Sequence, residues 1–167
     1  MALKANQKRD LVAKCYSEIL GRNIYSQDVT KRECVYKKHT DGKYYSDCSS
    51  SVRQAYKKAN IGLDYIGGNT AGIYNKYKDK EVKVTITNGI IKDTSSILRV
   101  CDILLFRGSD VNRPRTIGHV EIVSRIVGTT VYCYGHGSGV PSEKDLYKYC
   151  MHRYNMRINT PSGNCGI

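Results

Sequence analysis

Three residues of this 167-residue chain combine types and positions that suit nucleophilic catalysis. Cys48 lies where a helix is expected to begin, and the free N–H groups and dipole of a helix start stabilise a thiolate. His119 and His136 are candidates for a base and for the group that orients it. A thiol, a base and an orienting polar group form the triad of a nucleophilic enzyme. The alternative is a buried cysteine and two imidazoles with ordinary hydrogen bonds.

The two histidines flank a predicted β-hairpin. Residues 117–125 and 129–135 are rich in β-branched and aromatic residues, and Val127-Gly128 lies between them. If Val127 and Gly128 form a two-residue turn, His119 faces His136, with Cβ atoms about 5 Å apart. A histidine pair could also bind a metal. Since neither a carboxylate-and-histidine motif nor a C-x-x-C pair accompanies it, we expect no metal site and no cofactor.

Hydrophobic periodicity predicts the elements that hold these residues. We expect a helix over residues 5–20 and a second helix from Cys48 to about Asn60, capped by Asp47 or Ser46. A loop is expected over residues 67–72. The pattern also predicts strands at residues 82–86, 103–106 and 153–158 and a short helix at residues 142–151. Because helices precede strands, the fold class is α+β with an antiparallel sheet, in a single domain spanning residues 1–167.

Composition narrows the class of protein. Lys and Arg number 27 against 15 Asp and Glu, a formal charge of +12. That charge suits a polyanionic partner, although a basic surface without a partner remains the alternative. Seven widely spaced cysteines do not predict a disulfide framework. The sequence lacks an apolar run long enough for a membrane span and a secretory signal peptide, so we expect synthesis in the cytoplasm.

Four segments resemble, in order and spacing, the NlpC-type family of cell-wall cysteine peptidases. Residues 45–52 (YSDCSSSV) resemble the family segment D-C-S-[GS]-h-V, and residues 99–106 (RVCDILLF) its strand G-D-h-h-h-F. Residues 117–123 (IGHVEIV) resemble the strand G-H-V-x-I-h, and residues 134–139 (YGHGSG) fall where the family carries its third polar residue. The basic, tyrosine-rich composition also resembles catalytic modules of phage-derived lysins of Gram-positive bacteria.

The resemblance implies a papain-like fold, with N-terminal helices packed on a central antiparallel sheet. It implies that Cys48 is the nucleophile, His119 the general base and acid, and His136 the orienting residue. Two features depart from the family: Cys101 replaces a glycine, and the Trp-Gly-Gly that accompanies the family tyrosine is absent.

The remaining expectations concern residues around the triad. Tyr36 or Tyr45 is expected to line the site. Asp47 and Ser49 flank Cys48 and are expected near the substrate, although Asp47 also suits a helix cap and Ser49 the first helical turn. Glu121 shares a strand face with His119 and is either a supporting carboxylate or a surface residue.

The expected function is peptidoglycan hydrolysis. The enzyme would cleave an amide bond in or next to the stem peptide through a thioester, and act on the bacterial wall after release from the cell. Polyanionic wall polymers are the expected further partners. Two alternatives stay open: a basic, non-catalytic module that binds wall polymer or nucleic acid, and a papain-like amidase or transferase with a protein target.

Overall fold

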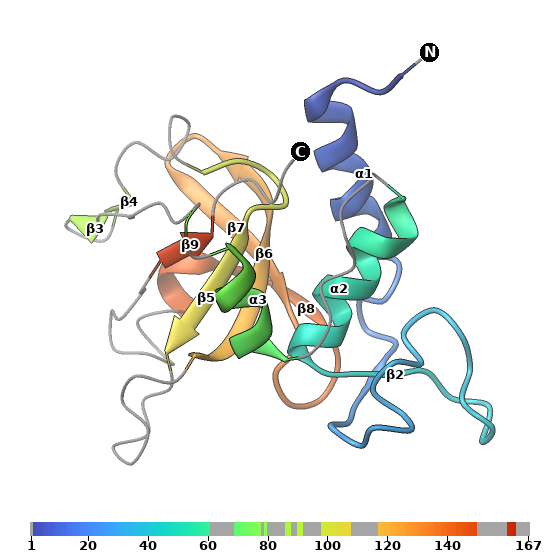
Figure 1. Cartoon of the computed structure of the whole chain (residues 1–167). Coiled ribbons are helices and arrows are strands. Elements are labelled where there is room, and N and C mark those ends of the chain that lie inside the picture. The colour runs from blue at the N-terminus through green and yellow to red at the C-terminus, as the bar shows by residue number, and fades with distance from the viewer. Residues whose placement is uncertain are drawn as a thin grey trace.

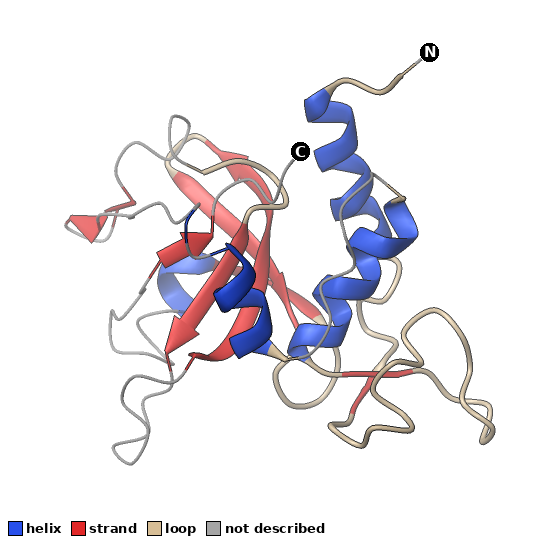
Figure 2. Ribbon diagram, viewed as in Figure 1, coloured by secondary structure: helices blue, strands red, loops and turns tan. Residues whose placement is uncertain are grey.

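The computed structural model describes residues 2–60, 69–77, 79, 86–87, 90–91, 98–107, 117–149 and 160–162. Two helices, α1 (Ala5–Ser17) and α2 (Cys48–Ala59), pack against each other on one side of a sheet, as Figures 1 and 2 show. A third helix, α3 (Thr70–Tyr77), also contacts the sheet. The α+β class predicted from the sequence, with N-terminal helices on a central antiparallel sheet, is confirmed.

In the part of the chain that the structure describes, the central sheet has five strands in the order β8-β7-β6-β5-β9, and every neighbouring pair is antiparallel. The remaining strands form two short pairs, β1 with β2 in parallel and β3 with β4 antiparallel. Within the described residues the strands are β1 Ile24–Tyr25, β2 Tyr45–Ser46, β3 Ile86–Thr87, β4 Ile90–Ile91, β5 Ile103–Arg107, β6 Ile117–Val127, β7 Thr130–Gly135, β8 Ser142–Asp145 and β9 Thr160–Ser162.

A capping box determines where α2 begins. The Asp47 carboxylate accepts a hydrogen bond from the Ser50 N–H at 2.8 Å, and the Ser50 hydroxyl accepts one from the Asp47 N–H, also at 2.8 Å. At the other end, Asn60 has a φ of 49°, the left-handed conformation that stops a helix. The predicted cap and end of this helix are therefore confirmed, and Cys48 is its first helical residue.

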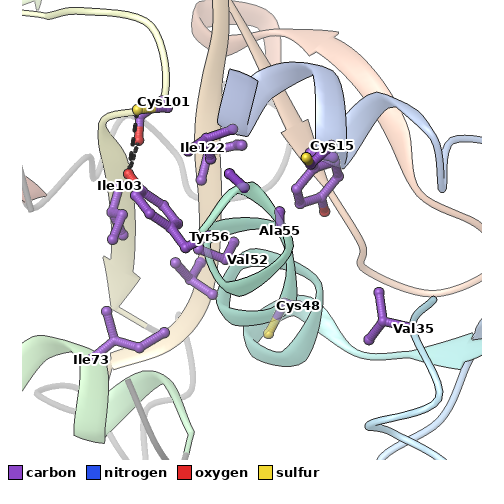
Figure 3. Close-up of a cluster of buried hydrophobic side chains, with 14 of the residues drawn as sticks. Cys15, Val35, Cys48, Val52, Ala55, Tyr56, Ile73, Cys101, Ile103 and Ile122 are labelled. Carbon is purple, nitrogen blue, oxygen red and sulfur yellow. Dashed lines mark hydrogen bonds between the residues drawn. The ribbon is translucent and has the colours of Figure 1, made fainter. Parts of the chain in front are cut away.

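Each face of the sheet covers a different hydrophobic cluster. One cluster lies between the sheet and the helices, where Val52, Ala55 and Tyr56 of α2 meet Ile103 and Ile122 (Figure 3). The second lies on the opposite face and contains Leu98, Leu104, Phe106, Val123, Val131, Cys133 and Leu146. Alternation along each strand therefore decides which cluster a side chain joins.

Two sequence predictions about elements are wrong in part. Residues 142–145 form the edge strand β8 instead of a helix; helical geometry follows only at residues 146–149. Their sequence, Ser-Glu-Lys-Asp, carries no apolar periodicity, and charged residues are typical of edge strands. The expected loop over residues 67–72 gives way to α3 from Thr70. The predicted strand at 153–158 and residues 82–85 of another lie outside the described residues.

The turn before β5 has the conformation of a glycine. Cys101 has a φ of 65°, the left-handed region that costs a non-glycine residue about 1–2 kcal/mol. Its N–H donates to the Val123 carbonyl at 2.7 Å, and its carbonyl accepts the Tyr56 hydroxyl at 2.5 Å. A glycine would adopt this conformation without that cost, and the contacts with Val123 and Tyr56 hold the turn in place.

A buried ion pair joins α1 to the same turn. Arg9 Nη1 donates to Asp102 Oδ1 at 2.8 Å and to the Val100 carbonyl at 3.0 Å. The second carboxylate oxygen of Asp102 accepts the Arg99 N–H at 2.8 Å, and the side chains of Arg9 and Asp102 are both buried.

Within the part of the chain that the structure describes, no helix is long and apolar enough to cross a membrane.

We predict that Asp102→Ala lowers the free energy of unfolding by about 3–5 kcal/mol, because it leaves the Arg9 guanidinium buried without its counter-charge. Asp10→Ala removes an exposed acid one residue from Arg9 and serves as the control, with an expected change within about 0.5 kcal/mol. Urea unfolding followed by circular dichroism measures both. Equal stability of the two variants would contradict the assignment.

Candidate active site

Cys48 occupies the first turn of α2, and its side chain is 8% exposed. The cap satisfies the Ser50 N–H, and the Ser51 N–H donates to the Asp47 carbonyl. The N–H groups of Cys48 and Ser49 have no protein acceptor among the residues that the structure describes. These two donors beside the sulfur can stabilise negative charge on a thiolate or on a carbonyl oxygen that the thiolate attacks.

His119, near the start of β6, links the cysteine to a carboxylate. Its Nε2 donates to Glu121 Oε1 at 2.9 Å, which leaves Nδ1 as the ring nitrogen for its hydrogen bond with Cys48. The imidazole also lies 5.9 Å from the Phe106 ring and 6.1 Å from the Tyr149 ring, measured between centroids. His119 is therefore oriented on one side by a carboxylate and on the other by the thiol.

The contacts of His119 favour its protonated form. Burial lowers the pKa of His119, but the hydrogen bonds with Cys48 and Glu121 and the charges of those groups outweigh burial and raise it to about 9. An imidazolium therefore faces the sulfur at neutral pH. It can pair with a thiolate and later give its proton to a leaving group.

Glu121 is a fully buried carboxylate with three side-chain donors. Oε1 accepts from His119 Nε2 and from Lys144 Nζ, the latter at 2.7 Å, and Oε2 accepts from Cys133 Sγ at 2.9 Å. Burial raises the pKa of Glu121, yet the hydrogen bond and charge of His119, followed by the charge of Lys144, bring it below its ordinary value. Glu121 is thus the supporting carboxylate, and the surface alternative is wrong.

The predicted pairing of His119 with His136 is also wrong. The turn is at Gly128-Thr129, where Gly128 has the positive φ that a type II′ turn requires at its first central position. A bulge between Val123 and Arg125 then shifts the register once more, so Glu121 faces Gly135.

The observed register does not set the two histidines directly opposite each other. His119 alternates with Val120, which packs against the helices, so the histidine points to the face of the second cluster. Tyr134 stacks on Tyr16 of α1, and His136 lies just beyond the end of β7. Because Glu121 faces Gly135, the register differs by one residue from the one that would set His119 opposite His136.

His136 instead holds the loop after β7. Its Nε2 donates to the Gly139 carbonyl at 3.0 Å, so its Nδ1 accepts from the Ser46 hydroxyl at 2.8 Å. Burial lowers the pKa of His136 and favours this neutral form. The ring also meets Tyr25 edge to face at 5.3 Å. Both ring nitrogens are engaged away from His119, and the residue joins this loop to β2.

The sulfur and the imidazole open onto a cleft of about 440 Å³. Its lining includes Tyr25, Cys48, His119, Ser138, Lys144 and Tyr149. Sequence reasoning missed Tyr25, Lys144 and Tyr149, because each comes from a segment with no motif or periodicity that points to the site. A volume of this size accommodates a short peptide segment or a comparable small ligand.

Of the described residues around the cleft, none of the four expected substrate contacts forms part of its lining. The Tyr36 hydroxyl donates to the Cys15 carbonyl at 2.6 Å, which ties it to α1. The Tyr45 hydroxyl donates to Asp41 at 2.8 Å. Asp47 caps α2 and pairs with Arg32 at 2.9 Å, and the Ser49 hydroxyl donates to Asp47 and accepts from Arg32. Asp47 and Ser49 thus support the start of α2, whereas Tyr36 and Tyr45 are bonded to α1 and to Asp41.

The comparisons with known proteins give a distant likeness. No protein-family model matches the sequence, and no match was found among curated proteins. One similar solved structure is described as the structure of NlpC1 from Trichomonas vaginalis, with a TM-score of 0.48 and 20% identity. The match covers 89% of this chain and 42% of that one, so this chain spans less than half the length of that structure.

Among the described residues, no group of three or more His, Cys, Asp or Glu is arranged to hold a metal ion.

We predict that His136→Ala destabilises the fold by about 1–3 kcal/mol, because the Ser46 hydroxyl and the Gly139 carbonyl lose a buried partner. The titration of the His119 imidazole, followed by NMR, should keep its wild-type midpoint. The opposite pattern, unchanged stability with a displaced His119 titration, would return His136 to the role of orienting residue.

Proposed function

We propose that this protein is a cysteine peptidase that cleaves an amide bond in or next to the stem peptide of bacterial peptidoglycan. One observation carries the proposal: Cys48 at the start of α2 and His119 are hydrogen-bonded to each other at a cleft, with Glu121 behind the imidazole. A thiol, a base and a group that orients the base are the parts that nucleophilic acyl transfer requires. A non-catalytic module would leave this arrangement without a purpose.

The proposed reaction has two halves. The Cys48 thiolate attacks the amide carbonyl carbon, and the resulting oxyanion lies near the N–H groups of Cys48 and Ser49. The His119 imidazolium protonates the leaving amine as the C–N bond breaks, which leaves a thioester on Cys48. The neutral His119 then takes a proton from water. The hydroxide equivalent attacks the thioester, and release of the carboxylic acid product regenerates the thiolate–imidazolium pair.

The substrate class is supported by sequence. The four segments that resemble NlpC-type peptidases place Cys48 and His119 at the family's catalytic positions, and the structure adds that both reach one cleft. The formal charge of +12 suits association with the polyanionic polymers of Gram-positive walls. The likeness to phage-derived lysins rests on the same composition and belongs to this proposal.

The test is digestion of purified peptidoglycan, with released fragments identified by mass spectrometry. We expect the wild type to release peptide fragments with a new amino terminus or free amine, and Cys48→Ala to release none above background. Cys34→Ala, which removes a partly exposed thiol that does not line the cleft, is the matched control and should retain full activity.

The outcomes separate the alternatives. Release that survives Cys48→Ala would show that the nucleophile is misassigned. If the wild type releases nothing from any wall chemotype while Cys48 is still rapidly alkylated by iodoacetamide, the chain is an amidase or transferase for another acyl substrate.

We predict that hydrolysis falls as the pH rises through about 9, where His119 loses the proton that the leaving amine needs. The same shift affects stability. Because the pKa of His119 is raised above its unfolded value of about 6.5, its contribution is fully present below about pH 6.5 and is lost as the pH rises through about 9. Rates on a soluble stem-peptide fragment and urea unfolding, both from pH 6 to 10, measure the two effects. A rate that is flat through pH 10 would contradict the role of His119.

A further inference from the structure

The buried carboxylate behind His119 is held from three adjacent strands. Glu121 itself is on β6, Cys133 on β7 contacts one carboxylate oxygen, and Lys144 on β8 contacts the other. The oxygen that binds Lys144 is the same Oε1 that accepts from His119. The ammonium and the imidazole therefore share one acceptor atom, and the position of that atom depends on both.

Gly135 provides the space for this arrangement. A Cβ atom at Gly135 would lie 2.1 Å from Glu121 Oε1, so the carboxylate occupies the volume where any other residue would place its side chain. Gly135 faces Glu121 across the strand pair, and its lack of a side chain leaves this volume to the carboxylate. The Glu121 side chain is 0% exposed, and a carboxylate without solvent requires compensating charge and hydrogen bonds.

Lys144 is also connected to His119 through the aromatic ring of Tyr149. Its ammonium lies 4.4 Å from the centroid of the Tyr149 ring, and that ring lies 6.1 Å from the His119 ring. The side chain is 24% exposed and lines the cleft. Lys144 thus contacts two groups that surround the imidazole, the Glu121 carboxylate and the Tyr149 ring. The Lys144 side chain also borders the cleft in which a ligand would bind.

We propose that Lys144 is a positioning residue of the site: through Glu121 it fixes the imidazole of His119 in the orientation that faces Cys48. The catalytic meaning of this role rests on the function proposed above, whereas the positioning itself does not. The chain of contacts runs from the edge strand β8 through β6 to the start of α2. The order of residues is Lys144, Glu121, His119 and Cys48.

The charged groups around Glu121 and His119 determine in which direction each substitution shifts the titration of His119. Besides Lys144 and Cys133, Glu121 contacts His119 on its own strand. Its charge also acts on the Tyr16 hydroxyl of α1, whose pKa is raised by burial and further by the Glu121 charge. Cys48 of α2 faces His119. Without the Lys144 charge, the negative charge of Glu121 is less compensated and favours the protonated imidazole more, so the pKa of His119 rises. Without the Glu121 charge, the pKa of His119 falls.

The experiment follows the His119 ring by NMR in Lys144→Met, Lys144→Arg and Glu121→Gln. Lys148→Met, an exposed site four residues further along, is the control for the loss of one positive charge. We expect Lys144→Met to raise the titration midpoint of His119 and to speed hydrogen exchange at its Nε2–H, because the carboxylate is no longer fixed. Glu121→Gln should lower the midpoint. Lys144→Arg and Lys148→Met should both resemble the wild type.

On a stem-peptide fragment, Lys144→Met should lower kcat about tenfold, the usual size of coupling within one hydrogen-bond network, and Lys144→Arg should restore most of it. A wild-type His119 midpoint and exchange rate in Lys144→Met would overturn the proposal. So would equal effects of Lys144→Met and Lys148→Met. Because the NMR measurements need no substrate, they can support the positioning role even if peptidoglycan is not hydrolysed. If Lys144→Met does not fold, Lys144→Gln, which also removes the charge, takes its place with the same expected and contradicting outcomes.

Discussion

A single negative charge inside the sheet constrains the arrangement around the candidate site. The Glu121 carboxylate is removed from water, which is costly unless hydrogen bonds and opposite charge replace the lost solvation. The protein supplies them with His119, Lys144 and Cys133, one each from β6, β8 and β7. This requirement links the strand order, the glycine at position 135 and the orientation of His119. A change in any of them would expose the carboxylate to water or leave it buried without its partners.

The other half of the site depends on a local feature of the chain. The capping box of Asp47 and Ser50 fixes the first turn of α2, and this places Cys48 beside two backbone N–H groups. Packing of α1 and α2 on the sheet then brings that turn toward the start of β6 (Figure 1). The ion pair between Arg9 and Asp102 ties the helices to the turn that leads into β5. The helix layer and the sheet thus each carry one half of the thiol–imidazole pair.

The arrangement departs from the resemblance in the identity of the third polar residue. The family pattern placed it at His136, after β7, whereas here the carboxylate comes from the same strand as the histidine it orients. His136 stays buried, but its two ring nitrogens contact Ser46 and Gly139 and so fix a loop that borders the cleft. Neither ring nitrogen of His136 bonds to His119, whose Nε2 donates to Glu121 instead.

The sequence alone determined what depends on neighbouring residues. Asp47, Cys48 and the apolar stripe of Val52, Ala55 and Tyr56 predict a capped helix with a cysteine at its start, since caps and helical periodicity are properties of a few consecutive residues. The order of helices before strands likewise predicts the α+β class. The tertiary structure decided which polar residue meets His119. That choice turns on the position of one hairpin turn and one bulge, and strands alternate with a period of two, so a shift of a single residue moves a side chain to the other face. Lys144 joined the site for a related reason: pairing of β8 with β7 brings it to Glu121, and no pattern in its own segment specifies that pairing.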